Sequence, residues 1–202
     1  MSPQVFALVG DAPDPATLNE AAAIIRGGGL VAFPTETVYG LGADATNPHA
    51  IERLNHVKGR PPDKPYSWHL HSVDQLRQWV PHVPPVAERL ITRFWPGPLT
   101  IVLPSRGGRT IGFRLPDHSI ATAFLRACRV PVAAPSANRS GFPPSLDAPE
   151  VVAAFDGAID GIVDGGPTRL GCESTVVEII GDRVEIRRVG AIAAASILAS
   201  VT

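Results

Sequence analysis

The chain has 202 residues, of which 45% are hydrophobic and 18% charged, with a formal net charge of -1 at pH 7. This composition is that of a globular protein and excludes a disordered one, while the near-neutral balance argues against a strongly basic nucleic-acid binder. Cys128 and Cys172 form neither a CxxC pair nor part of a zinc-spaced cluster, so we expect a reduced, cytoplasmic setting. The sequence shows no signal peptide and no apolar run long enough to cross a membrane.

Apolar and β-branched segments bounded by glycine, proline or polar residues predict the strands. These segments are residues 4–9, 30–34, 65–71, 99–104, 110–116, 130–136, 161–164, 174–180 and 183–189. A polar, glycine-rich run follows the second of them, over residues 35–45, and carries no strand prediction.

Capping residues and helical spacing of apolar residues predict the helices between these strands. Asp14 and Pro15 begin the first helix, and the triple glycine at 27–29 ends it. Further helices are predicted from Asn47-Pro48 to Val57, from the capping box at Ser72 and Gln75 to Val80, over 86–94, 119–129 and 191–200, and after the cap at Asp147 and Glu150.

Hairpins connect several of the predicted strands. Residues 99–104 and 110–116 flank a glycine turn, and Gly181-Asp182 is a turn signal between the last two strands. This pattern favours an α/β fold with a mixed sheet and helices packed on it, rather than a regular doubly wound sheet. With no repeat or linker, residues 1–202 are predicted to form a single domain.

Five polar clusters interrupt the apolar pattern, each at or just beyond the end of a predicted strand. The clusters are residues 34–40, 58–69, 110–114, 134–141 and 171–176. They offer hydroxyls, an amide and fixed cations, which are donors for anionic oxygens. Loops at strand ends are common places for binding sites. Because no Walker loop, Rossmann turn, HExxH motif or catalytic-triad order is present, we expect groups from separate loops to hold an anion.

Each cluster also has a structural interpretation. The segment KGRPPDKP (58–65) could be solvated surface, and 134–141 could be only a turn. His69 on a strand is more often a packing histidine than a catalyst, and Cys172 is most simply a small buried residue. Arg114 is harder to dismiss, because a buried arginine needs an anionic partner, either a ligand or a structural carboxylate.

Taken together, the clusters resemble the YrdC-type L-threonylcarbamoyladenylate synthase family, from about residue 16 to residue 190. The stretches that carry the resemblance are GGGLVAFPTETVYGLGADA, KGRPPDKP, WPGPLTIVL, TIGFRLPDH, APSANRSG, ESTVVEI and RRVGAI. The resemblance implies a twisted, mostly open α/β sheet with helices packed around a central positively charged cavity. It also implies an ATP-dependent nucleotidyltransferase reaction, in which L-threonine, bicarbonate or carbon dioxide, and ATP give threonylcarbamoyl-AMP and pyrophosphate. A downstream threonylcarbamoyl-transferase system would then modify tRNA.

The resemblance also implies roles for residues at matching positions. The L-threonine pocket would comprise Thr35, His69, Arg114 and Ser174 with the backbone at Ala134. The ATP side would comprise Lys58, Arg60, Lys64, Thr110, Ser136, Asn138 and Arg188 with the backbone near Pro144. Lys58 and Arg60 would be catalytic by offsetting charge on the phosphates. We expect Mg²⁺ to arrive with ATP rather than in a dedicated protein site, and no general base stands out.

The sequence departs from the family at two of these positions. Lys64 stands where many relatives have Asn, and Pro144 where a Ser is often found, which affects affinity more than reaction type. The chain resembles the short form of the family, without an extra C-terminal domain. A carbamoyl-transfer module of hydrogenase maturation and a non-catalytic paralogue binding double-stranded RNA, tRNA or nucleotide are the alternatives. The intact KGR and SAN motifs favour the synthase.

Overall fold

The computed structural model describes residues 2–8, 14–61, 65–155 and 157–201. Helices in this part of the chain are α1 (Pro15–Arg26), α2 (Pro48–Lys58), α3 (Val73–Trp79), α4 (Pro85–Phe94), α5 (Ser119–Cys128), α6 (Ala148–Phe155) and α7 (Ala194–Ala199). Strands are β1 (Gln4–Ala7), β2 (Val31–Phe33), β3 (Gly40–Asp44), β4 (Trp68–His69), β5 (Leu99–Pro104), β6 (Thr110–Arg114), β7 (Val132–Ala133), β8 (Gly161–Asp164), β9 (Thr175–Ile180) and β10 (Arg183–Arg188).

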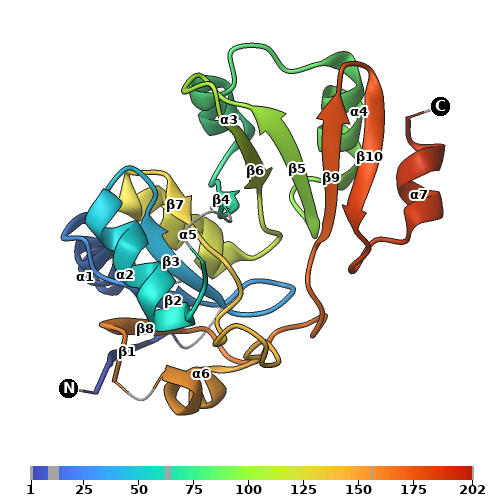
Figure 1. Cartoon of the computed structure of the whole chain (residues 1–202). Helices are drawn as coiled ribbons and strands as arrows, with labels where there is room; N and C mark the ends of the chain where they lie inside the picture. The colour runs from blue at the N-terminus through green and yellow to red at the C-terminus, as the bar shows by residue number, and fades with distance from the viewer. Residues whose placement is uncertain (1, 9–13, 62–64, 156, 202) are drawn as a thin grey trace.

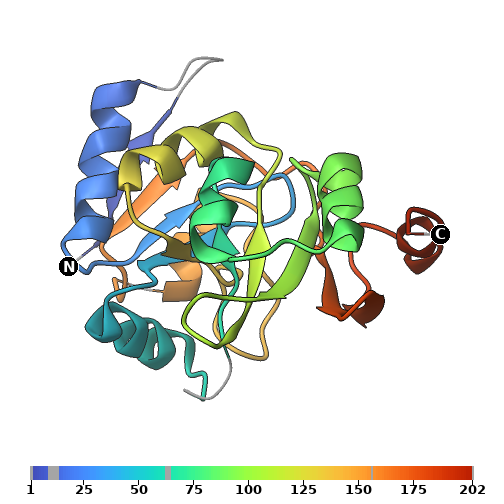
Figure 2. The ribbon, with the colours of Figure 1, turned by 90° about the horizontal axis from the view of Figure 1, so that it is seen from above.

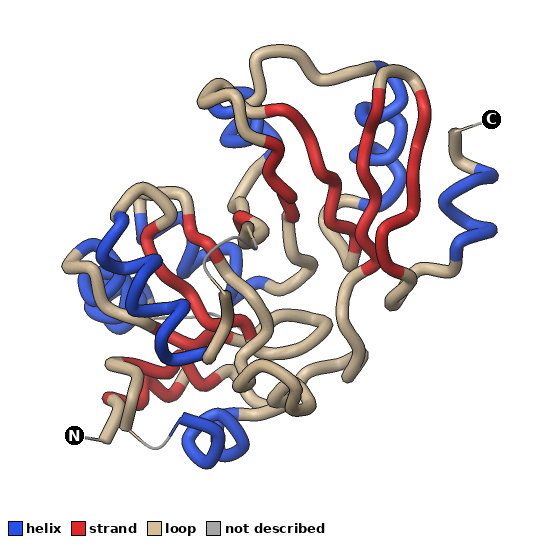
Figure 3. The backbone as a smooth tube through the Cα atoms, viewed as in Figure 1, coloured by secondary structure: helices blue, strands red, loops and turns tan. Residues whose placement is uncertain are grey.

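The strands form one sheet in the order β1-β8-β2-β3-β7-β4-β6-β5-β9-β10. The sheet contains parallel pairs such as β4–β6 and β5–β9 and antiparallel pairs such as β2–β3 and β5–β6, which confirms the predicted mixed sheet. Figure 1 shows two groups of strands, one with β1, β8, β2, β3 and β7, the other with β6, β5, β9 and β10. The two-residue strands β4 and β7 connect the groups, since β4 pairs with β7 on one side and with β6 on the other over only two residues each. Both strands are short red segments in Figure 3.

Each group of strands carries its own helices. In Figure 2, α1 and α5 lie side by side, and their apolar faces form a core with β2 and β8. Leu18, Ala22 and Ile25 recur on the buried face of α1, as their spacing predicts. The larger core includes residues of α4 and of the β5–β6 and β9–β10 hairpins. No helix in the described ranges is both long and apolar enough to span a membrane.

Most predicted helix ends are confirmed by the caps. The side chain of Asp14 accepts hydrogen bonds from the backbone N–H groups of Ala16 and Thr17, and Gly27 caps the other end of α1. Ser72 caps α3 by accepting from Gln75 N, but the Gln75 side chain accepts from His71 N, so only half of the predicted capping box forms.

Three strand assignments needed correction. Strand β3 forms within the glycine-rich run that carried no strand prediction, and Gly42 fits there where a side chain would be crowded. A Cβ on Gly42 would lie 3.1 Å from Val132 and 3.2 Å from Phe33. Glycine usually weakens a strand, so this signal was hidden in the sequence. The predicted strand 65–71 shortens to Trp68–His69, since residues 65–67 are non-strand backbone. The predicted strand 130–136 likewise shortens to Val132–Ala133.

Candidate active site

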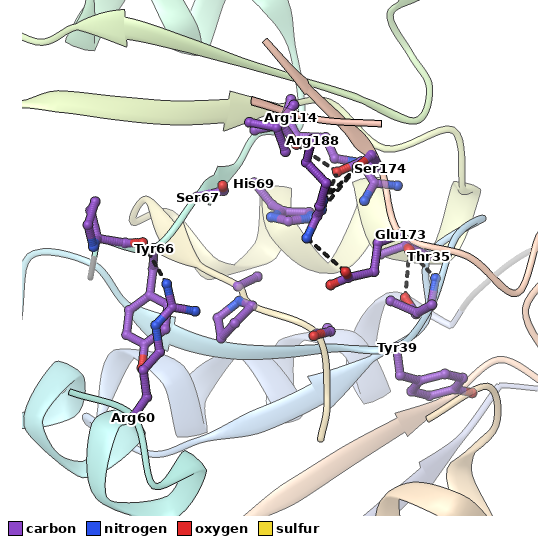
Figure 4. Close-up of a pocket in the computed structure, with 18 residues that line it drawn as sticks. Thr35, Tyr39, Arg60, Tyr66, Ser67, His69, Arg114, Glu173, Ser174 and Arg188 are labelled. Carbon is purple, nitrogen blue, oxygen red and sulfur yellow. Dashed lines mark hydrogen bonds and ion pairs between the residues drawn. The ribbon is translucent and has the colours of Figure 1, made fainter. Parts of the chain in front are cut away.

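A polar cavity of about 160 Å³ opens where the two groups of strands meet. Its wall combines the β2–β3 connection, the ends of β4 and β6, the segment after β7, and residues beside β9 and β10 (Figure 4). The volume is below the roughly 300–1,000 Å³ of pockets for drug-sized ligands, so the enclosed part suits a smaller molecule. Predicted site residues on its wall are Thr35, Arg60, His69, Arg114, Ala134, Ser136, Ser174 and Arg188.

Strand register places His69 and Arg114 side by side. β4 and β6 are parallel, and His69 is in register with Arg114. Residues in register on neighbouring strands point to the same face of a sheet, so both side chains face the cavity. Phe33 packs edge-on against His69, with ring centroids 6.0 Å apart.

Arg114 pairs with a buried carboxylate. Its Nη2 lies 2.8 Å from Oε2 of Glu36, and the two side chains are only 5% and 1% exposed. Glu36 is therefore the structural carboxylate that a buried arginine requires. The contact is close but poorly aligned, so Nε and Nη2 of Arg114 lack a hydrogen bond of good geometry and keep donor capacity. Burial lowers the pKa of Arg114, and the charge of Glu36 opposes that effect.

His69 presents a neutral imidazole to the cavity. Burial, and then the charge of Arg114, lower its pKa well below the usual 6.5. Nδ1 of His69 has no hydrogen-bond partner among the described residues. A neutral ring can both accept and donate, so His69 can contact a polar group on a ligand.

Two hydroxyls of the cavity wall, those of Thr35 and Ser174, each pair with another hydroxyl. Thr35 Oγ1 is 2.8 Å from Thr37 Oγ1 and donates to the carbonyl of Val38, which holds the β2–β3 connection in place. Ser174 Oγ lies 2.9 Å from Thr100 Oγ1 across the parallel β5–β9 pair. These hydroxyls can exchange one internal hydrogen bond for a bond to a ligand.

Arg188 and Glu173 form a second pair on the cavity wall. Arg188 Nη1 is 2.8 Å from Oε2 of Glu173, and Nε and Nη2 donate to the carbonyl of Ser174 at 3.2 and 3.0 Å. Their side chains are 43% and 39% exposed. Gly190 lies against the Glu173–Ser174 backbone, where any Cβ would overlap it. Sequence reasoning named neither Glu173 nor Glu36, although both lie inside the polar clusters.

The KGR segment divides its two cations. Lys58, at the end of α2, is 3% exposed, and its Nζ donates to the carbonyls of Ser136 and Asn138 at 2.6 Å each. Lys58 is not on the cavity wall. Burial, with repulsion from Arg60, lowers the pKa of Lys58 to about 8. Arg60 is on the wall and stacks over the ring of Tyr66 at 4.7 Å.

Lys64 lies outside the described residues, and three further predicted residues lie beside the cavity rather than on its wall. Thr110 is at the opposite end of β6 from Arg114, in a depression shared with Pro65 and Tyr66, which also line the cavity. Asn138 and Pro144 line another depression beside Phe142, and the Asn138 side chain accepts from Ser136 Oγ at 2.7 Å. A ligand reaching all of these residues must extend out of the cavity.

Metal ligands are sparse in the described part of the chain. No group of three or more His, Cys, Asp or Glu side chains is close enough there to hold an ion. Glu173 is the only carboxylate residue on the cavity wall among the described residues. The cavity therefore offers mainly cations and hydroxyls.

This fold and site define an α/β protein with a polar cavity, lined by cations and hydroxyls, at the junction of a mixed sheet. A family model described as "Telomere recombination" (Sua5_yciO_yrdC) matches residues 23–190. The chain belongs to the Sua5/YciO/YrdC family, which confirms the resemblance inferred from the sequence motifs.

Named relatives and a solved structure agree with this assignment. The chain is 44% identical over 185 residues, 87% of the chain and 54% of the relative, to a threonylcarbamoyl-AMP synthase of Bacillus subtilis. It is 48% identical over 168 residues, 79% of the chain and 49% of the relative, to a threonylcarbamoyl-AMP synthase of Pyrococcus abyssi. A crystal structure of P. abyssi Sua5 complexed with L-threonine superposes with a TM-score of 0.91 at 41% identity, covering 97% of this chain and 60% of that one. The chain thus spans about half the length of these two synthases.

Proposed function

We propose that this chain is an L-threonylcarbamoyladenylate synthase, which joins L-threonine, bicarbonate or carbon dioxide, and ATP into threonylcarbamoyl-AMP and releases pyrophosphate. The observation that carries this proposal is Arg114, a buried guanidinium with unused donors on the wall of a cavity of amino-acid size. We call the part of the wall that carries the buried polar side chains of Thr35, His69, Arg114 and Ser174 the enclosed end. Relatives with that name, and a relative whose structure holds L-threonine, support the proposal.

L-Threonine fits the enclosed end. Its carboxylate would bind Arg114, because a planar guanidinium holds a carboxylate through two parallel hydrogen bonds. The neutral imidazole of His69 and the hydroxyls of Thr35 and Ser174 would contact the threonine hydroxyl and backbone atoms. The backbone at Ala134 completes this end.

ATP is larger than the cavity of about 160 Å³ and would lie across its opening. Arg60, Ser136 and Arg188 would bind phosphate oxygens from the wall. The nucleotide would extend over the two adjoining depressions, toward Thr110 on one side and toward Asn138 and Pro144 on the other. We place Lys64 on this side because of its motif alone.

Lys58 would act differently from Arg60. Its Nζ is tied to two carbonyls, so it would hold the 136–138 segment and contribute positive charge from behind the wall. Arg60, stacked on Tyr66, would meet the phosphates directly. Both cations would offset the negative charge that develops as pyrophosphate leaves.

Positioning accounts for most of the proposed catalysis. A neutral threonine amine attacks carbon dioxide to give a carbamate, and a carbamate oxygen then attacks the α-phosphorus of ATP. Holding the reactants together can lower such a barrier by about 7–11 kcal/mol. Mg²⁺ bound to the ATP phosphates would supply charge neutralisation there. Since Glu173 is the only described carboxylate residue on the wall, phosphates and water would supply most of the metal's ligands.

Pyrophosphate release tests the proposal. Purified protein with ATP and Mg²⁺ should release pyrophosphate only when both L-threonine and bicarbonate are present. Release independent of threonine, or none at all beside tight RNA or nucleotide binding, would contradict the synthase and favour the non-catalytic alternative. The proposed product would pass to a threonylcarbamoyl-transferase system that modifies tRNA.

A further inference from the structure

Glu173 is an acidic side chain on an otherwise cationic and hydroxyl-bearing wall. It precedes Ser174 and lies between β8 and β9, with its carboxylate 2.8 Å from Nη1 of Arg188. In Figure 4, Glu173 and Arg188 point toward one another into the cavity. The bond to Arg188 uses Oε2, while Oε1 makes no hydrogen bond with any described residue.

An amino acid in this cavity brings two groups of opposite charge. Its carboxylate is matched by Arg114. Its amino group carries N–H donors and needs an acceptor, which arginine and lysine side chains cannot provide. Among the described residues on the wall, Glu173 is the only one with a carboxylate. We propose, on the basis of the proposed function, that Glu173 binds the amino group of the amino-acid substrate.

Glu36, the other carboxylate of the site, cannot take this role. It is 1% exposed, pairs with Arg114 and is not on the cavity wall. Glu173 is 39% exposed, so a ligand can reach it without displacing core residues.

Arg188 does not block the proposed contact. A carboxylate has about four lone-pair positions, so Glu173 can accept from Arg188 through one oxygen and from the substrate nitrogen through the other. Both an ammonium and a neutral amine carry N–H donors. The contact therefore persists when the amine loses its proton before it attacks carbon dioxide.

This assignment makes Glu173 a specificity residue for amino acids over acids that lack the amino group. The matched pair of ligands is L-threonine and (R)-3-hydroxybutyrate, which shares the carboxylate, the hydroxyl and the methyl group. Wild-type protein should bind L-threonine far more tightly, because only threonine offers a donor to Glu173.

Glu173→Gln tests the proposal by calorimetric titration of both ligands. The carboxamide keeps an oxygen for Arg188 but removes the charge. We expect the affinity for L-threonine to fall about ten- to a hundredfold, as expected when a hydrogen bond between charged groups is lost. The affinity for (R)-3-hydroxybutyrate should change less than about threefold. Glu173→Asp, which keeps the charge, should recover part of the threonine affinity.

Glu178→Gln is the matched control. Glu178 lies on β9 and pairs with Arg187 on β10 at 2.6 Å, so this variant also breaks a Glu–Arg pair next to the same hairpin but away from the cavity wall. It should bind both ligands as the wild type does.

Two outcomes would overturn the assignment. If Glu173→Gln lost affinity equally for both ligands, the role of Glu173 would be purely structural. If its affinity for L-threonine were unchanged, Glu173 would not contact the amino group. Either result leaves the proposed function standing if the wild type still releases pyrophosphate with threonine and bicarbonate. Failure of the wild type to bind threonine and to release pyrophosphate would remove both.

Discussion

Two arginine–carboxylate pairs border the same cavity in different environments. Arg114 and Glu36 are 5% and 1% exposed, whereas Arg188 and Glu173 are 43% and 39% exposed, although both pairs are 2.8 Å long. Each residue of a buried ion pair loses much of its hydration and depends on its partner for compensation. A half-exposed ion pair contributes little to stability. The enclosed pair is therefore part of the scaffold that aims Arg114, and the open pair is available to ligands.

The largest expected difference between the two pairs is in the stability lost when the carboxylate of each is removed. Glu36→Gln leaves Arg114 buried without a charged partner, so the free energy of unfolding should fall by about 3–5 kcal/mol. Glu173→Gln should lower it by no more than about 1 kcal/mol. Urea unfolding measures both values, and similar losses for the two variants would refute the distinction.

The buried cation Lys58 should make stability depend on pH. Its pKa is about 8 in the folded protein and about 10.4 in the unfolded chain, so between these values the unfolded state binds more protons. Stability should therefore rise with pH, by about 1–2 kcal/mol from pH 8 to 9.5 relative to Lys58→Met. Urea unfolding at several pH values checks this. If the free energy of unfolding varied with pH in the same way in the wild type and in Lys58→Met, the pKa of Lys58 would not be lowered in the folded protein.

The protonation state of His69 should not change with pH in the range tested. Because burial and Arg114 hold its pKa well below 6.5, its imidazole should stay neutral from pH 8 to 6. Nitrogen NMR shifts of the ring report the protonation state directly. A titration midpoint near 6.5 would mean that the enclosed end is wetter than the geometry indicates.

The sequence predicted the elements that have strong local signals. Asp14 and Asn47 cap their helices, and the β5–β6 and β9–β10 hairpins form as expected. Strand β3 was missed because glycine is a weak strand former, and the close packing of Gly42 against Val132 and Phe33 is visible only in the folded sheet.

The site was predicted as residue types rather than as geometry. Arg114 was expected to need an anion, but Glu36 could be identified only when the fold brought the β2–β3 connection into contact with the end of β6. The motif that contains Lys58 and Arg60 gave no sign that one cation turns inward to carbonyls and the other outward over Tyr66. The direction of Lys58 depends on contacts with residues about 80 positions away, and that of Arg60 on a loop conformation that brings Tyr66 beneath it.

The most direct test of this account is L-threonine binding to Arg114→Lys. Lysine keeps the positive charge but lacks the planar fork that holds a carboxylate with two hydrogen bonds. Calorimetric titration should show an affinity about tenfold or more below that of the wild type, while Arg187→Lys, on the half-exposed β10 pair, binds normally. Undiminished binding by Arg114→Lys would contradict the placement of the substrate carboxylate at the enclosed end of the cavity.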